Sequence, residues 1–265
     1  MKSFLRWTII IVAVGLAIGC IETTTLVTVN KDGSGSVSQT VLISTALTEL
    51  LAGMAVGATV PNTLDEDRLN DMRDKAEEMG VKLVDAQPLI SETGAGFTAI
   101  YEFKDINKVR INQNPGDLVP TPAGASDPED QIAEYITFQF TPGNPATLVV
   151  INPKEEPDFD TTEEDQSQEA ADEMMPDMVS ELFKGMRINI AVEVVGSVVD
   201  TDATYVDGST ITMMDMDFGI LLSDEETFKT LARANPQSLA ETKELVENAA
   251  GIRIELQDRI EVRFR

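Results

Sequence analysis

Residues 22–44 read ETTTLVTVNKDGSGSVSQTVLIS, and this segment sets the expected class of fold. Both of its flanks are rich in threonine and valine, β-branched residues that favour strands. Asp32-Gly33 lies between the flanks, and an Asp-Gly pair in that position is typical of a tight hairpin turn. The segment therefore predicts an antiparallel β-hairpin.

The last third of the chain carries a second hairpin signal. Residues 187–195, RINIAVEVV, alternate apolar and more polar side chains, as a half-buried strand does. Asp207-Gly208 then separates VVDTDATYV from TITMMDMDF, which predicts another tight turn. Residues 252–264 place apolar side chains at most even positions, and Asp258 on that face marks either a bulge or turn, or a buried acid.

Helices are expected between the strands. Residues 45–58 form a mildly apolar segment that we interpret as a covered helix. Thr63 and Glu66 form a capping box, which opens a second helix that Gly80 ends. Two further capping boxes predict two helices near the end of the chain: Ser223 with Glu226, and Ser238 with Glu241.

The middle of the chain is rich in loops. Residues 112–130 hold several prolines and glycines, which predicts a loop. Residues 136–140 and 147–151 are short strand candidates, and residues 154–173 are acidic with little apolar content. We therefore divide the chain into a leader (1–19), a first α+β half (20–110), a loop-rich insertion with short strands and an acidic segment (111–180), and a second α+β half (181–265).

The two halves share an order of parts. Each has a strand, an Asp-Gly-Ser turn that begins at Asp32 or Asp207, a strand, two helices, and a glycine, Gly80 or Gly251, that opens a last strand. This order indicates two copies of a ββααβ unit; the alternative is coincidence, because hairpins and helix pairs are common. The expected fold class is α+β, with one antiparallel sheet, helices packed on one face, and a groove between the copies as the natural ligand site.

Residues 1–20 have the order of a secretory signal. Lys2 and Arg6 are basic, residues 7–18 carry no charge, and small residues precede Cys20. The uncharged run is shorter than the roughly 20 residues that a membrane-spanning helix needs, which disfavours an uncleaved anchor. An ordinary signal peptide that happens to end near a cysteine is the other alternative.

Gly19-Cys20 resembles the lipobox of bacterial lipoproteins. In that family the cysteine thiol receives a diacylglycerol, the chain is cleaved before the cysteine, and the new N-terminus is acylated. The resemblance implies cleavage after Gly19 and a lipid on Cys20, at the extracytoplasmic face of a membrane. Ile21 follows, and by resemblance to the sorting rule of enteric bacteria this residue implies the outer membrane if the host has one.

Two longer stretches resemble LppM-like envelope lipoproteins: VTVNKDGSGSV and MRINIAVEVVGSVVDTDATYVDGSTIT. The shared features are an Asp-Gly hairpin after the first strand at Asp32, a Gly-x-Val bend at Gly196 and a second Asp-Gly hairpin at Asp207. The resemblance implies an α+β envelope lipoprotein with lipid or glycolipid binding.

The charge of the chain and its lack of histidine exclude several functions. The chain holds 46 Asp plus Glu against 20 Lys plus Arg, a formal net charge of −26, so we expect no nucleic-acid partner. Without histidine there is no Ser-His-Asp or Cys-His nucleophile and no His-based zinc site. The single cysteine is assigned to lipid, which also excludes thiol catalysis and disulfides, and we expect no cofactor.

Four aspartates near the second hairpin are candidate cation ligands: Asp200, Asp202, Asp215 and Asp217. In a register centred on the Asp-Gly turn, Asp200 or Asp202 would lie near Asp215, and paired carboxylates can bind calcium or carry out acid–base chemistry. The alternative is that they are solvated carboxylates at a sheet edge, since like charges that face each other are destabilising.

The sequence favours a non-enzymatic, membrane-anchored envelope lipoprotein that binds a partner protein or an apolar or lipid ligand. On this interpretation the chain has no catalytic residue and no resident metal. Two alternatives stay open: a structural or assembly subunit of an envelope complex, and a metal-binding or hydrolytic protein built from carboxylates.

Overall fold

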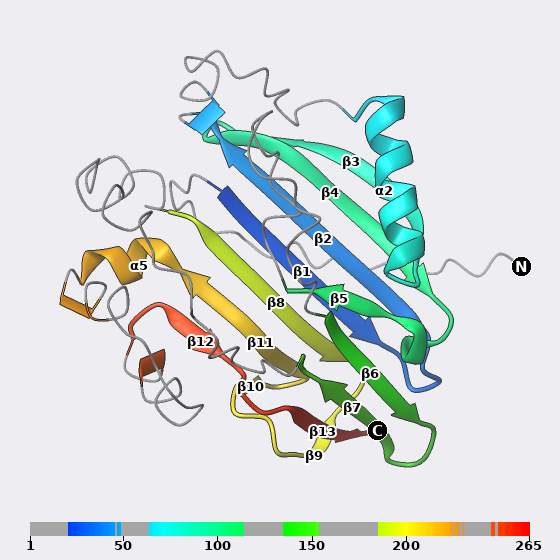
Figure 1. Cartoon of the computed structure of the whole chain (residues 1–265). Coiled ribbons are helices and arrows are strands. Elements are labelled where there is room, and N and C mark those ends of the chain that lie inside the picture. The colour runs from blue at the N-terminus through cyan, green and yellow to red at the C-terminus, as the bar shows by residue number, and fades with distance from the viewer. Residues whose placement is uncertain are drawn as a thin grey trace, which may run out of the picture.

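Figure 1 shows the computed structural model of the chain. The structure describes residues 21–45, 64–113, 135–153, 185–224 and 249–265, with residues 47, 48, 226, 227, 230, 245 and 246 besides. Several predictions of the sequence lie outside these residues: the leader with Gly19 and Cys20, most of the 45–58 helix, the acidic 154–173 segment and the Ser238 capping box.

The larger of two sheets has eight strands, which we call the large sheet. Its strands lie in the order β10-β11-β8-β1-β2-β4-β3, and β12 also pairs with β11. The strands are β1 (Ile21–Val29), β2 (Gly35–Ser44), β3 (Lys82–Ile90), β4 (Gly94–Phe103), β8 (Arg187–Val194), β10 (Val206–Asp207), β11 (Thr210–Asp217) and β12 (Ile252–Ile254).

The first predicted hairpin is confirmed. β1 and β2 pair antiparallel, with Val27 opposite Val37. Gly33 has a φ of 83° in the turn, a conformation that favours glycine. A Cβ at Gly33 would also lie 2.7 Å from the ring of Phe140, so the turn needs glycine for space as well as for conformation.

The neighbour of β1 on its other side is β8, and these two strands run parallel. Ile190 lies opposite Thr25, and Val192 lies opposite Val27. The expectation of a purely antiparallel sheet was therefore wrong. Alternation along a strand indicates which face is buried, but the direction of the neighbouring strand depends on the path of the connecting chain.

A second sheet of five strands, the small sheet, packs against the large one. Its order is β5-β6-β7-β13-β9. Both sheets contribute to one hydrophobic core, in which Val37 and Val41 of the large sheet and Leu148, Ile260 and Phe264 of the small sheet are fully buried. The strands are β5 (Arg110–Asn112), β6 (Tyr135–Thr141), β7 (Ala146–Ile151), β9 (Val198–Thr201) and β13 (Arg259–Phe264).

Helix α2 (Glu66–Glu78) lies along the large sheet beside the small sheet (Figure 1). Met72 and Ala76 of this helix are buried in the shared core, and the guanidinium of Arg68 lies 5.2 Å from the centre of the Phe97 ring. The other helical elements with described bounds are short, the 3₁₀ turn η1 (Ile106–Lys108) and α5 (Phe218–Ser223).

The predicted α+β arrangement, one antiparallel sheet with helices on one face, was therefore wrong. In the described residues the protein is mostly β, and a second sheet shares one hydrophobic core with the large sheet. The physical reason lies in the last segment of the chain. Ile252 and Ile254 join the large sheet, whereas Ile260 and Val262 join the small one, and an alternating pattern cannot indicate that its two parts belong to different sheets.

The predicted repeat of two ββααβ units does not match the pairing of the strands. In the first copy β3 pairs with β4, which separates it from β2. In the second copy β12 pairs directly with β11, and β9 belongs to the small sheet. Equal order along the chain therefore does not produce equal topology. The strands of each sheet also come from more than one of the predicted segments, since β1 pairs with β8 and β7 pairs with β13.

The ends of the helices correct two capping predictions and confirm a third. Asp65, not Thr63, caps α2, because its carboxylate accepts a hydrogen bond from the Arg68 N–H. Gly80 ends the helix with a φ of 73°, as predicted. Ser223 is the last residue of α5, and Asp224 instead accepts bonds from the N–H and hydroxyl of Thr227. Among the described residues, no helix is long and apolar enough to cross a membrane.

Candidate functional site

The four candidate aspartates are divided between the two sheets: Asp200 lies on the small sheet, Asp202 directly follows its strand β9, and Asp215 and Asp217 lie on the large sheet. The Asp207-Gly208 hairpin is present, but its first strand is short. Only Val206 and Asp207 on that side of the turn pair with β11. Upstream of this point β9 pairs with β13, so Asp200 belongs to the small sheet. Asp215 instead lies opposite Asn189 of β8 and Arg253 of β12.

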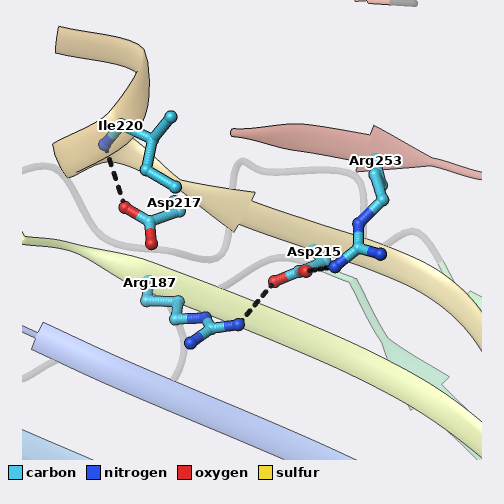
Figure 2. A network of polar contacts seen from close by, with 5 residues as sticks. All are labelled: Arg187, Asp215, Asp217, Ile220 and Arg253. Atoms are coloured by element: carbon cyan, nitrogen blue, oxygen red, sulfur yellow. Dashed lines mark hydrogen bonds and ion pairs between the residues drawn. The ribbon is translucent and has the colours of Figure 1, made fainter. Parts of the chain in front are cut away.

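Asp215 is held between two arginines (Figure 2). Its carboxylate is buried and accepts hydrogen bonds from Arg253 and, at 3.4 Å, from Arg187. Both arginine side chains stay about half exposed. A carboxylate that leaves water must be paired and hydrogen-bonded, and the two guanidinium groups provide this. The arrangement joins β8, β11 and β12 on one face of the large sheet.

Asp217 caps the short helix α5. Its carboxylate accepts a hydrogen bond of 3.0 Å from the Ile220 N–H, as Figure 2 shows. Its own backbone N–H donates to the Gly251 carbonyl at 2.7 Å. The residue therefore fixes the place where β11 turns into α5.

Asp200 and Asp202 make contacts within the small sheet. The Asp202 carboxylate accepts a 2.7 Å hydrogen bond from the Glu261 N–H. Asp200 and Arg263 form an exposed ion pair at 3.9 Å. In the described part of the chain, no three His, Cys, Asp or Glu side chains lie where they could hold a metal ion together.

Sequence reasoning missed a partly buried polar cluster between the sheets, in which Asn152 and Glu255 are buried. Residues 202–205 lead from β9 to β10, and residues 255–258 lead from β12 to β13, so both connections cross from one sheet to the other. Thr204 joins them, because its N–H donates to Glu255 Oε2 at 2.6 Å and its hydroxyl to Oε1 at 3.0 Å. We call Asn152, Thr204, Glu255 and Gln257 the crossing cluster.

The rest of the crossing cluster ties the small sheet to the same connections. The side-chain amide of Asn152 donates to the carbonyls of Glu255 at 2.9 Å and Gln257 at 2.7 Å. Gln257 Nε2 donates to the Asp202 carbonyl at 2.8 Å. Glu255 is buried and lies between Ile254 and Leu256 in sequence, where alternation predicts an exposed side chain. Asp258 is exposed within this break, which confirms the bulge-or-turn interpretation and not the buried acid.

The pKa shifts in the described residues have local causes. Hydrogen bonds from Ser34 lower the pKa of Asp32, and those from Asn107 lower the pKa of Asp105. Burial raises the pKa of Tyr101 to about 12, and the negative charge of Asp71 contributes a smaller part of this rise. The hydrogen bonds that lower the pKa of Asp32 and Asp105 are local, and these carboxylates therefore stabilise turns.

One end of the large sheet contains the residue that follows the predicted lipid anchor in sequence. β1 begins at Ile21, the residue after Cys20, and Ile21 pairs with Ile43 near the end of β2. We call this the Ile21 end; β4, β8 and β12 also begin here, and β3 and β11 end here. Ile90 is the last residue of β3 and is 75% exposed, and Ile220 of α5 is 49% exposed.

Comparison with known proteins finds little that resembles this chain. No protein-family model matches it, and no curated protein matches it. Among solved structures it resembles the NMR structure of the folded domain of LppM from Mycobacterium tuberculosis, with 6% sequence identity and a TM-score of 0.34, over 96% of this chain and 94% of that chain. The chain therefore has only a weak structural resemblance to the LppM domain, at a level that shows neither a shared fold nor a shared function.

Proposed function

We propose that the protein is an envelope lipoprotein, held at a membrane by a lipid on Cys20, and that it acts by binding and not by catalysis. One observation carries the proposal. Strand β1 begins at Ile21, the residue directly after Cys20, and lies between β2 and β8 in the large sheet. A lipid on Cys20 would therefore be attached one residue before a strand that pairs on both sides.

The anchor has a physical rationale. A single acyl chain binds a membrane only marginally, whereas several chains on one residue give stable attachment. The strongly acidic chain offers little electrostatic attraction to anionic headgroups, so lipid on Cys20 would provide the attachment.

The contacts of the acidic side chains favour binding over acid–base chemistry. Asp215 is neutralised by two arginines, and Asp217 caps a helix. Asp202 and Glu255 accept backbone N–H groups that fix the connections of the chain. These carboxylates have structural partners, and the ligand we propose is a partner protein or an apolar or lipid molecule.

Substitution Cys20→Ala tests the anchor. We expect the wild-type protein to fractionate with membranes and its N-terminal peptide to carry the mass of diacylglycerol and an acyl chain. The variant should lose this mass and leave the membrane fraction. A Cys20→Ala protein that stays on the membrane, with no unprocessed form present, would contradict the proposal.

The ligand is tested by native mass spectrometry of the protein purified from its own membrane. We expect a bound lipid or a partner chain in addition to the acylated protein. Observation of the bare acylated chain alone, under conditions that preserve a known lipoprotein–ligand complex, would contradict the binding role but not the anchor.

A further inference from the structure

We propose that the Ile21 end of the large sheet rests on the bilayer surface, with Ile90 and Ile220 inserted among the lipid headgroups. The proposal rests on the lipid anchor at Cys20 and adds the orientation of the folded body. The proposed binding partner of this surface is therefore the same membrane into which the lipid on Cys20 would insert.

The first argument is the length of chain between lipid and sheet. Consecutive Cα atoms are about 3.8 Å apart, so Cys20 lies within one such step of Ile21. The strand is held by pairing from its first residues, since Ile21 lies opposite Ile43 and Glu22 lies opposite Leu42 and Arg187. No spacer separates the anchor from the body, and the Ile21 end must stay close to the lipid.

The second argument is the exposed apolar side chains at this end. Ile90 is the most exposed large apolar side chain among the described residues. Ile220 lies in α5, which starts where β11 ends, and therefore belongs to the same end of the sheet. Isoleucine side chains gain free energy when they leave water, and the membrane interface would remove both from it.

Charge at the Ile21 end is mixed, because the exposed Glu92 follows Ile90 in the turn between β3 and β4, and the exposed Asp224 follows α5. Arg187 and Arg253 lie here, and each keeps about half of its side chain exposed while it binds Asp215. Their guanidinium groups can meet lipid phosphates, which offsets part of the repulsion expected from so acidic a chain. The proposal therefore predicts contact with a mixed zwitterionic and anionic bilayer.

The chain offers a direct test because its single cysteine is consumed by the lipid. A second cysteine introduced by Ile90→Cys or Ile220→Cys can be labelled alone in the acylated protein with an environment-sensitive fluorophore. Val195→Cys and Val206→Cys are matched controls, since these valines are 44% and 42% exposed and lie at the opposite end of the sheet.

Each labelled protein is reconstituted in vesicles of phosphatidylethanolamine and phosphatidylglycerol, with and without lipids that carry a nitroxide quencher. We expect a blue shift and strong quenching for labels at 90 and 220, and neither for labels at 195 and 206. Equal emission and equal quenching for the two pairs, in protein that floats with the vesicles, would overturn the orientation and leave the anchor intact.

Two further outcomes are decisive. If the wild-type acylated preparation does not float with vesicles at all, the anchor itself fails and the orientation fails with it. If emission at 90 and 220 shifts only as protein density rises, without quenching by the nitroxide lipids, the surface binds a second copy of the chain and the membrane contact is wrong.

Discussion

At the scale of single residues, Gly80 and Gly208 show how surroundings decide what a residue must be. Both have a positive φ, 73° and 62° respectively. A Cβ at Gly80 would lie 2.1 Å from the Lys108 carbonyl oxygen, whereas a Cβ at Gly208 would meet no atom within 4 Å. The sequence predicted both glycines as turn or stop positions. The close contact of Gly80 with the backbone of Lys108 could not be predicted, because the two residues are distant in sequence.

We predict that Gly208→Ala lowers the free energy of unfolding by about 1–2 kcal/mol, the cost of a left-handed conformation for a residue with a side chain. Gly80→Ala must also displace the carbonyl of Lys108, so its loss should clearly exceed that of Gly208→Ala. Urea denaturation of the two variants measures the difference. Equal losses would show that the close approach at Gly80 is relaxed without cost.

Tyr101 gives the fold a dependence on alkaline pH. Its side chain is buried, its hydroxyl donates to Gln39 Oε1 at 3.5 Å, and burial raises its pKa from 10.0 to about 12. The folded protein therefore keeps the phenolic proton at a pH where the unfolded chain has lost it. The associated stabilisation is complete below pH 10 and is lost as the pH rises towards about 12.

We predict that the free energy of unfolding of the wild-type protein falls between pH 10 and pH 12. Tyr101→Phe removes the titrating group, so the variant should lose less stability over the same range. Denaturant titrations at several pH values test this, with absorbance of the phenolate as a second measure. A decline of equal size in both proteins would assign the effect to other groups.

At the scale of elements, the crossing cluster fixes how the two sheets are joined. β12 and β13 follow each other in sequence but lie in different sheets, and so do β9 and β10. Glu255 accepts hydrogen bonds from Thr204 across the two connections, and the side-chain amide of Asn152 donates to the carbonyls of Glu255 and Gln257. Each strand could be predicted from its alternating residues, but the partner sheet could not, because strand pairing and hydrogen bonds between distant segments determine where the chain changes sheet.

Glu255→Ala should destabilise the fold by about 1–3 kcal/mol, because the two hydrogen bonds that the buried Glu255 carboxylate accepts from the N–H and hydroxyl of Thr204 are lost. Glu261→Ala is the matched control, since this glutamate lies on the following strand with an exposed side chain and should change stability by less than about 0.5 kcal/mol. Chemical denaturation of both variants gives the comparison. Equal effects would mean that the carboxylate of Glu255 contributes nothing specific.

At the scale of the whole molecule, the two sheets form one packed unit. The fully buried side chains of β1 and β2 belong to the same core as those of β7 and β13. The hairpins, the strands of residues 136–151 and the break near Asp258 could be predicted from turn residues and alternation. The division into two sheets and the parallel pairing of β1 with β8 could not, because both depend on contacts between distant segments.

A shared core has a consequence for unfolding, because neither sheet can lose its packing without exposing the other. Leu148 of β7 is fully buried, and Leu148→Ala should cost about 2–5 kcal/mol. We predict that this loss appears equally in the slowest-exchanging amides of β1 and of β7 when hydrogen exchange is followed by mass spectrometry. Val199→Ala, at an exposed position of β9, should leave both unchanged. If Leu148→Ala accelerates exchange in the small sheet while β1 keeps its protection, the sheets unfold independently, and the common core contributes less to cooperativity than its packing indicates.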